Sequence, residues 1–214
     1  MITTPELIEV LASRAKPVRR LRPPLLRAAF WLVLAALVFG LLAAAHGTRT
    51  DLAQQFARPE FALGLAASLL TGVLAGVAAF FLSLPDRSRA WSFLPVPTLV
   101  LWISTVSYGC LTHWVDVGPD GMRMGEAARC FATLLVTSLP LSLGLIVMLR
   151  HAAWLRTTAV TLTGGLAVAA MAATALSLFH NLDATIMVLI WNFGVTAIIV
   201  GAGYLFGRRA TASA

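Results

Sequence analysis

The sequence predicts an all-α, polytopic membrane protein: a bundle of six transmembrane helices with both termini in the cytoplasm. Three observations support this prediction. Hydrophobic residues make up 59% of the 214 residues, charged residues only 12%, and the mean hydropathy is +0.85, whereas soluble domains are about half apolar and a quarter charged. The apolar residues form unbroken blocks of about 20, the length that a helix needs to cross a bilayer. The basic residues gather on one side of these blocks. This pattern excludes an ordinary soluble enzyme, a disordered chain and a disulfide-rich secreted scaffold, and it is unlike the alternating strands of an outer-membrane barrel.

Six spans are expected where the apolar runs are longest: Leu25–Ala45, Phe61–Ser83, Trp91–Gly109, Ala127–Leu149, Thr158–Phe179 and Thr185–Phe206. This division gives an N-terminal cytoplasmic tail at residues 1–24, a membrane domain at 25–206 and a short C-terminal cytoplasmic tail at 207–214. The third span is the shortest, and its first turns hold Pro95 and Pro97, at positions where proline is best tolerated. The first span starts too late and is too long for a cleaved signal peptide, so we expect it to remain as an anchor.

The distribution of basic residues sets the orientation of the bundle. With six spans, twelve of the sixteen Lys and Arg residues fall on the side that holds both termini, and the positive-inside rule places that side in the cytoplasm. The net charge of +7 is also compatible with nucleic-acid binding. Because most of the basic residues flank span ends, we instead expect them to contact the lipid bilayer, with no direct binding to nucleic acid.

The residues within the spans argue against several membrane functions. No Asp, Glu, Lys or His lies near a span midplane, and Arg27 and Arg129 lie close to span ends, from which they are expected to snorkel towards the headgroups. Ion-coupled transporters, proton pumps and intramembrane proteases keep ionisable groups in the membrane. The chain also lacks the P-loop, G-x-S-x-G, H-E-x-x-H and C-x-x-C motifs, so we expect no enzyme activity and no cofactor. A small passive transporter or channel and a structural subunit of a membrane complex are the alternative functions.

The tail is predicted to begin with a short amphipathic helix at about residues 5–15, because Thr-Thr-Pro-Glu is a helix-start pattern and Pro17 ends it. One face of this helix carries its apolar side chains, among them Leu7, Ile8 and Leu11. A helix of this length is marginal alone in water. Its apolar face therefore needs a partner, and both the bilayer surface and a helix-binding protein are open. A basic stretch follows, which includes Arg19, Arg20 and Arg22.

Three segments carry a resemblance to a known family: ELIEVLASRAKPVRRLRPP in the tail, LLVTSLPLSLGLIVMLRHAAWLR, and SLFHNLDATIMVLIWNFGV. Together with the span count, they resemble the NrsF family of six-span anti-sigma factors of the bacterial inner membrane. The resemblance implies a protein that sequesters an extracytoplasmic-function sigma factor of the sigma-F type and releases it on envelope, heavy-metal or redox stress. In this function, Leu7, Ile8 and Leu11 would anchor the sigma factor, and Arg19, Arg20 and Arg22 would position it electrostatically.

The two cysteines are candidates for redox sensing. Cys110 and Cys130 are both expected near the outer surface, where the compartment permits disulfides. The family pattern implies a cysteine at Cys130 and a second directly after the histidine at position 180, but this chain has Asn181 there. Cys110 is the remaining candidate partner. Alternatively, each cysteine is a small apolar residue that fills space between helices.

The outer loops also contain residue types that bind metals. His113 and Asp116 are three residues apart, as are His180 and Asp183, and this spacing places each pair on one helix face. Together with the cysteines they are a candidate site for a soft or borderline divalent ion. The alternative is that these polar residues only end helices at the membrane interface.

Overall fold

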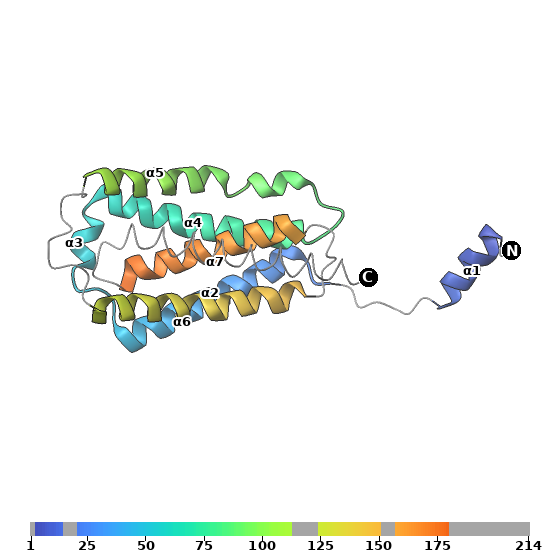
Figure 1. The fold of residues 1–214 in the computed structure, drawn as a ribbon, viewed down its shortest axis with the longest axis horizontal. Helices are drawn as coiled ribbons and strands as arrows, with labels where there is room; N and C mark the ends of the chain where they lie inside the picture. The colour runs from blue at the N-terminus through green and yellow to red at the C-terminus, as the bar shows by residue number, and fades with distance from the viewer. Residues whose placement is uncertain (1–2, 15–20, 113–123, 151–156, 180–214) are drawn as a thin grey trace.

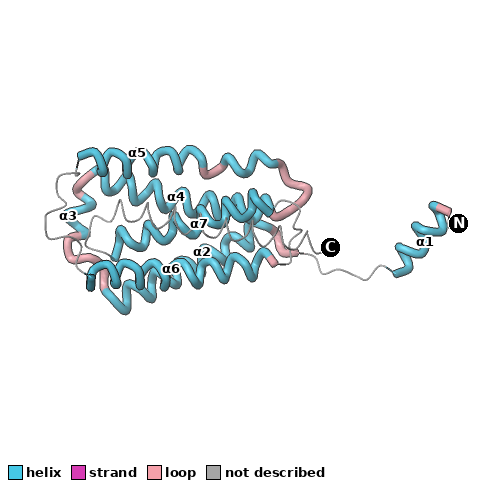
Figure 2. Tube along the Cα trace, viewed as in Figure 1, coloured by secondary structure: helices cyan, strands magenta, loops and turns pink. Residues whose placement is uncertain are grey.

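The computed structural model describes residues 3–14, 21–112, 124–150 and 157–179, and every regular element in these ranges is a helix (Figure 1). In chain order the helices are α1 (Thr4–Arg14), α2 (Pro24–His46), α3 (Leu52–Phe56), α4 (Pro59–Leu82), η1 (Arg89–Phe93), α5 (Val96–Thr112), α6 (Met124–Leu149) and α7 (Thr157–Phe179). The five long helices α2, α4, α5, α6 and α7 lie side by side (Figure 2). Helix α1 lies apart from this bundle.

Five segments of the described chain are long and apolar enough to cross a membrane: Pro24–Ala45, Pro59–Leu82, Arg89–Ser107, Ala132–Leu149 and Thr157–Phe179. They correspond to the first five predicted spans. The sixth predicted span, Thr185–Phe206, lies outside the described residues. We call the end of the bundle where α2 and α7 begin the tail end, because the tail joins α2 there. The opposite end, where α2, α5 and α7 finish, is the far end.

The third span differs from its prediction as one helix over Trp91–Gly109. It consists of the 3₁₀ helix η1 followed by α5. Ser88 begins η1, since its hydroxyl accepts a hydrogen bond of 3.1 Å from the Ala90 N–H. Pro95 and Pro97 carry no backbone N–H, so a regular helix cannot continue through them with all its hydrogen bonds. The physical reason for the break is therefore the proline pair, which the sequence analysis had placed inside a continuous helix.

Helices α4 and α7 form the centre of the bundle. In each of them 61% of the span is buried, against 6% of Arg89–Ser107, so α5 is peripheral. Small residues allow the two central helices to approach closely: a Cβ atom on Gly72 would lie 3.0 Å from Met171 Cγ. At the same contact the hydroxyls of Ser68 and Thr174 form a buried hydrogen bond of 3.0 Å. This bond fixes the register of α4 against α7.

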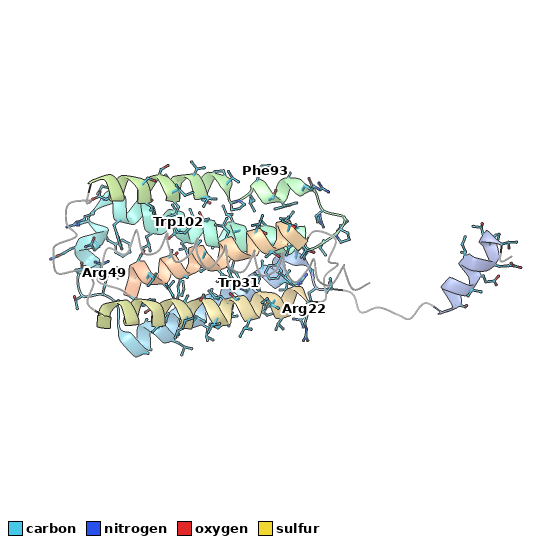
Figure 3. All side chains as sticks on the ribbon, in the orientation of Figure 1. Arg22, Trp31, Arg49, Phe93 and Trp102 are labelled. Atoms are coloured by element: carbon cyan, nitrogen blue, oxygen red, sulfur yellow. The ribbon has the colours of Figure 1, made fainter. Side chains whose placement is uncertain are left out.

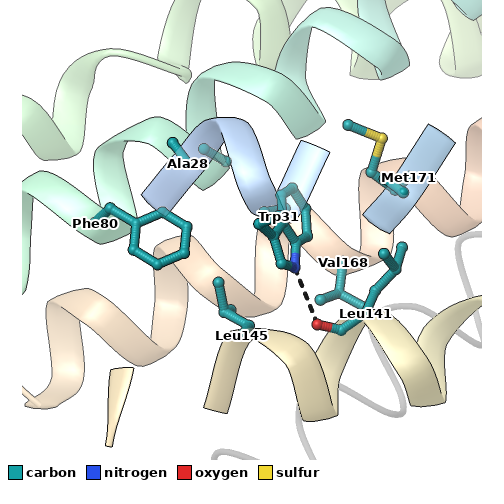
Figure 4. Close-up of a cluster of buried hydrophobic side chains, with 10 residues drawn as sticks. Ala28, Trp31, Phe80, Leu141, Leu145, Val168 and Met171 are labelled. Carbon is teal, nitrogen blue, oxygen red and sulfur yellow. Dashed lines mark hydrogen bonds between the residues drawn. The ribbon is translucent and has the colours of Figure 1, made fainter. Parts of the chain in front are cut away.

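Helix α2 packs onto the centre through Trp31, which is fully buried. The indole Nε1–H donates a hydrogen bond of 3.0 Å to the Leu141 carbonyl of α6 (Figure 4). The ring itself lies against α4, where a Cβ on Gly76 would come within 2.8 Å of Trp31 Cζ3. Trp31 therefore joins α2, α4 and α6, because its ring fits a site that only glycine leaves open and its polar atom finds an acceptor.

Candidate functional site: the tail and the two ends of the bundle

The tail helix α1 covers Thr4–Arg14, where a helix over residues 5–15 was expected. Its first turn is closed by a hydrogen bond of 2.8 Å from the Thr3 N–H to the Glu6 carboxylate, which is half of a capping box. This hydrogen bond lowers the pKa of Glu6 below its ordinary value. Ile8 is 62% exposed. Leu7 and Leu11 lie on α1, but their side chains are outside the described part of the structure.

The basic stretch is described only at its end. Arg19 and Arg20 lie outside the described residues. Arg22 is exposed, and its guanidinium lies 5.5 Å from the centroid of the Phe30 ring on α2. Such a cation–π contact at an exposed site contributes about 0.5–1 kcal/mol. Arg22 therefore lies against the membrane domain, where the tail joins it.

Arg27 is buried, and the expectation that it snorkels to the headgroups is wrong. Only 6% of the residue is exposed. Its Nη2 donates a hydrogen bond to the carbonyl oxygen of Met148, in the last turn of α6. Its guanidinium lies 5.1 Å from the ring centroid of Phe80 on α4. The side chain turns inward because these two neighbouring helices offer an acceptor and a ring face, which no local sequence pattern reveals.

A loop of charged residues follows α4 at the tail end. Asp86 and Arg87 form an ion pair at 3.6 Å, with both side chains exposed, and such a pair contributes little to stability. Beneath it the rings of Phe81 and Trp91 stack with their centroids 4.0 Å apart. The guanidinium of Arg87 lies 5.7 Å from the Phe81 ring centroid. Aromatic packing thus holds η1 against the end of α4.

The far end is held by a second buried arginine, which the sequence analysis did not single out. Arg49 donates two hydrogen bonds to Asp51, from Nε at 2.6 Å and from Nη2 at 2.8 Å. Asp51 also accepts a bond of 2.9 Å from Gln55. The Arg49 and Gln55 donors hold the pKa of Asp51 well below its usual range. The backbone N–H of Arg49 donates to the Leu178 carbonyl at 3.2 Å, so this loop is attached to the end of α7.

The sites of the two buried arginines, Arg27 and Arg49, lie at opposite ends of the bundle. Figure 3 marks these ends by Arg49 at the far end and by Arg22 at the tail end, with Trp31 between the helices. The Arg-x-Asp spacing of Arg49 and Asp51 was a visible sequence signal for the far-end pair, since two residues can pair across a turn. For Arg27 the sequence offered no such signal, because its acceptor, the Met148 carbonyl, lies 121 positions away.

The redox candidates lie near helix ends. Cys110 is in the last turn of α5 and Cys130 in the second turn of α6, and both of these turns are at the far end. Neither cysteine side chain is described. The metal candidates His113, Asp116, His180 and Asp183 lie outside the described residues. Within residues 3–14, 21–112, 124–150 and 157–179, no three His, Cys, Asp or Glu side chains gather as metal ligands do.

The class of protein that these long apolar helices indicate is an integral membrane protein. The family described as NrsF, negative regulator of sigma F, matches residues 11–212. The chain belongs to this family. No curated protein and no solved structure matches the chain significantly. Family membership assigns the chain to negative regulation of a sigma factor. The matched region begins at Leu11, so most of α1 precedes it.

Proposed function

We propose that the protein is an anti-sigma factor of the bacterial inner membrane. It sequesters an extracytoplasmic-function sigma factor with its cytoplasmic tail and releases that factor on envelope, heavy-metal or redox stress. The bundle has six spans in this proposal, and both termini face the cytoplasm. The observation that carries the proposal is α1, an amphipathic helix that lies apart from the bundle with the side chain of Ile8 exposed.

The chemistry of α1 suits capture of a protein. Leu7, Ile8 and Leu11 share one face of the helix, as the anchors of a helix that binds in a groove do. The capping hydrogen bond between Thr3 and Glu6 favours the helix before a partner arrives, so less ordering free energy is lost on binding. Arg19, Arg20 and Arg22 accelerate the encounter with an acidic surface.

The principal experiment places two charges on the apolar face of α1. Leu7→Asp with Leu11→Asp should abolish sigma-factor binding, because two carboxylates would be buried in a desolvated groove. Binding is measured by co-purification from solubilised membranes and by a sigma-dependent reporter, which should become constitutive. No span is altered, so insertion into the membrane should be normal.

A matched pair of single variants controls for charge alone. Leu11→Asp and Ser13→Asp introduce the same charge two residues apart, on opposite faces of α1. Leu11→Asp should weaken repression strongly, whereas Ser13→Asp should leave it near the wild-type level. If the inserted double variant still represses fully, α1 is not the capture element. The loop between α4 and η1 would then be the next candidate.

The basic stretch has a smaller expected effect. Replacing Arg19, Arg20 and Arg22 with Gln should weaken capture partially and make it less dependent on salt, since exposed charges act mainly on the association rate. The measurement is the association rate at two ionic strengths. An unchanged salt dependence would reject the electrostatic role of these residues.

Signal reception is proposed for the far end, where α5 ends and α6 begins. Cys110 and Cys130 form a disulfide on oxidation in this proposal, and thiol labelling on non-reducing gels tests it. Two free thiols in oxidised membranes would reject the bridge. His113, Asp116, His180 and Asp183 bind the metal signal. An unchanged reporter response to metal in the His113→Ala, His180→Ala double variant would count against this metal site.

A further inference from the structure

The connection between α4 and α5 exposes an aromatic side chain at the tail end. We call residues 84–93 of this connection, which include η1, the η1 loop. Phe93 is 70% exposed, more than any other large hydrophobic side chain of the described residues, and Figure 3 shows it on the outer side of the bundle. Because covering a Phe ring is favourable, this side chain indicates contact with an apolar neighbour outside the bundle.

Phe93 stands at the head of an apolar stripe on α5. Val96, Val100 and Ile103 are exposed, and their spacing of four and three residues places them on one helix face. The 17 residues of α5 span about 25 Å, less than the hydrocarbon core of a bilayer, which is about 30 Å thick. The η1 loop therefore lies where the hydrocarbon ends and the headgroups begin, with the stripe running from it into the hydrocarbon.

Two exposed arginines, Arg87 and Arg89, lie in the η1 loop at this depth. Guanidinium groups bind phosphate oxygens through charge-assisted hydrogen bonds, often two at a time. Asp86 is the only acidic residue of the loop, and it pairs with Arg87 at 3.6 Å. Both side chains of this pair are exposed, and exposed pairs are weak, so a phosphate can compete for Arg87.

The η1 loop is held in one shape before any ligand binds. The Trp91 ring stacks on Phe81 of α4 with the centroids 4.0 Å apart, and the Arg87 guanidinium lies 5.7 Å from the same Phe81 ring centroid. Within η1, the Ser92 hydroxyl donates a hydrogen bond of 2.8 Å to the Arg89 carbonyl. A ligand at this loop therefore loses little free energy in ordering the backbone that presents the arginines.

We propose that the η1 loop binds an anionic phospholipid. Arg87 and Arg89 bind the headgroup phosphate, and an acyl chain lies along Phe93 and the exposed stripe of α5. An acidic protein surface would match the arginines, but it could not follow the stripe into the hydrocarbon. A zwitterionic lipid would match the stripe, but its headgroup cation would oppose the arginines. A phospholipid of net negative charge satisfies both parts of the surface.

The test titrates the detergent-solubilised full chain with phosphatidylglycerol and with phosphatidylcholine of the same acyl chains, and counts bound lipids by native mass spectrometry. The wild type should prefer phosphatidylglycerol. Arg89→Gln should weaken that binding about fivefold, the effect of one basic residue at a membrane surface, and adding Arg87→Gln should remove most of the preference. The matched control is Arg58→Gln, which removes an exposed arginine just before α4 at the far end and should bind as the wild type does.

Phe93→Ser separates the acyl-chain contact from the phosphate contact. It should weaken binding of both lipids alike, because their acyl chains are identical. The thermal midpoint in lipid-free detergent should stay at the wild-type value in Arg89→Gln and Phe93→Ser, since both side chains are exposed.

Three results would overturn the lipid site. The first is equal affinity of the wild type for the two lipids. The second is an equal loss of binding in Arg89→Gln and Arg58→Gln, which would show an effect of net charge alone. The third is an Arg87→Gln, Arg89→Gln double variant that keeps the lipid preference but captures the sigma factor more weakly, because the η1 loop would then face an acidic protein.

Discussion

Arg27 and Arg49 are equally buried, with 6% of each residue exposed, but they lie at opposite ends of the bundle and have different partners. Arg49 has a carboxylate that accepts from two of its nitrogens, and its charge is neutralised locally. Arg27 has one carbonyl, one aromatic ring and a nitrogen for which the described residues provide no hydrogen-bond partner. The difference shows that burial of an arginine does not define its role. The partners do: a carboxylate neutralises the far-end arginine, whereas a helix-end carbonyl and an aromatic ring hold the one at the tail end.

The comparison implies that packing, rather than charge, holds the tail end together, and Trp31 tests this most strongly. Trp31→Ala should lower the free energy of unfolding by about 3–5 kcal/mol, because a fully buried ring is lost and a cavity remains between α2, α4 and α6. Denaturant titration of the purified protein in mild detergent measures this loss in the free energy of unfolding.

Trp31→Phe is the control for this experiment. It keeps most of the ring but removes the hydrogen bond to the Leu141 carbonyl, so it should cost about 1 kcal/mol. Equal losses in the two variants would mean that the hydrogen bond, and not the ring, holds α2 in place.

At the far end the two members of the ion pair should not be equivalent. Asp51→Asn leaves Arg49 buried with its charge uncompensated, whereas Arg49→Met leaves a half-exposed carboxylate that water can solvate. We therefore expect the thermal midpoint of Asp51→Asn to fall further than that of Arg49→Met. The opposite order would show that Arg49 acts mainly by covering Phe61, whose ring centroid lies 5.7 Å from its guanidinium.

Acid provides the smallest perturbation, and it acts on the far end. The pKa of Asp51 is lower in the folded protein than in the unfolded chain, where an aspartate titrates at about 3.9. The ion pair therefore contributes its full stability above that pH and loses it as the pH falls further, towards the folded-state pKa. Between pH 7 and 5 this contribution should be constant. Subtracting the stability curve of Asp51→Asn from that of the wild type isolates it, and a difference that already changes above pH 5 would contradict this assignment.

The sequence predicts the helices well because local sequence signals mark where each helix begins and ends. The ends of α2, α4, α6 and α7 lie within three residues of the expected spans, since Pro24 and Pro59 begin helices and apolar runs define their lengths. The break before α5 was visible as Pro95 and Pro97, but whether a proline pair starts or interrupts a helix depends on neighbouring contacts. Arg27 could not be predicted, because its acceptor belongs to a residue 121 positions away.

The candidate site is predictable to a smaller extent. The amphipathic helix of the tail follows from the pattern around Glu6 and from the apolar spacing of Ile8 and its neighbours. The placement of Cys110 and Cys130 in turns at the same end follows from alternating helix directions. Whether their sulfur atoms meet depends on how α5 and α6 sit around α4, and helix spacing along the sequence does not determine that arrangement.

The contact between α4 and α7 also has a consequence for biosynthesis. Ser68 and Gly72 face α7, but the ribosome completes α7 only after two further spans have been made. Until then, the face of α4 that carries the Ser68 hydroxyl and the Gly72 backbone has no α7 helix to pack against. Small and polar faces of this kind are poorly matched to lipid. A chain that stops before Thr174 would keep that face uncovered, so it would lack the hydrogen bond that sets the register of the two central helices.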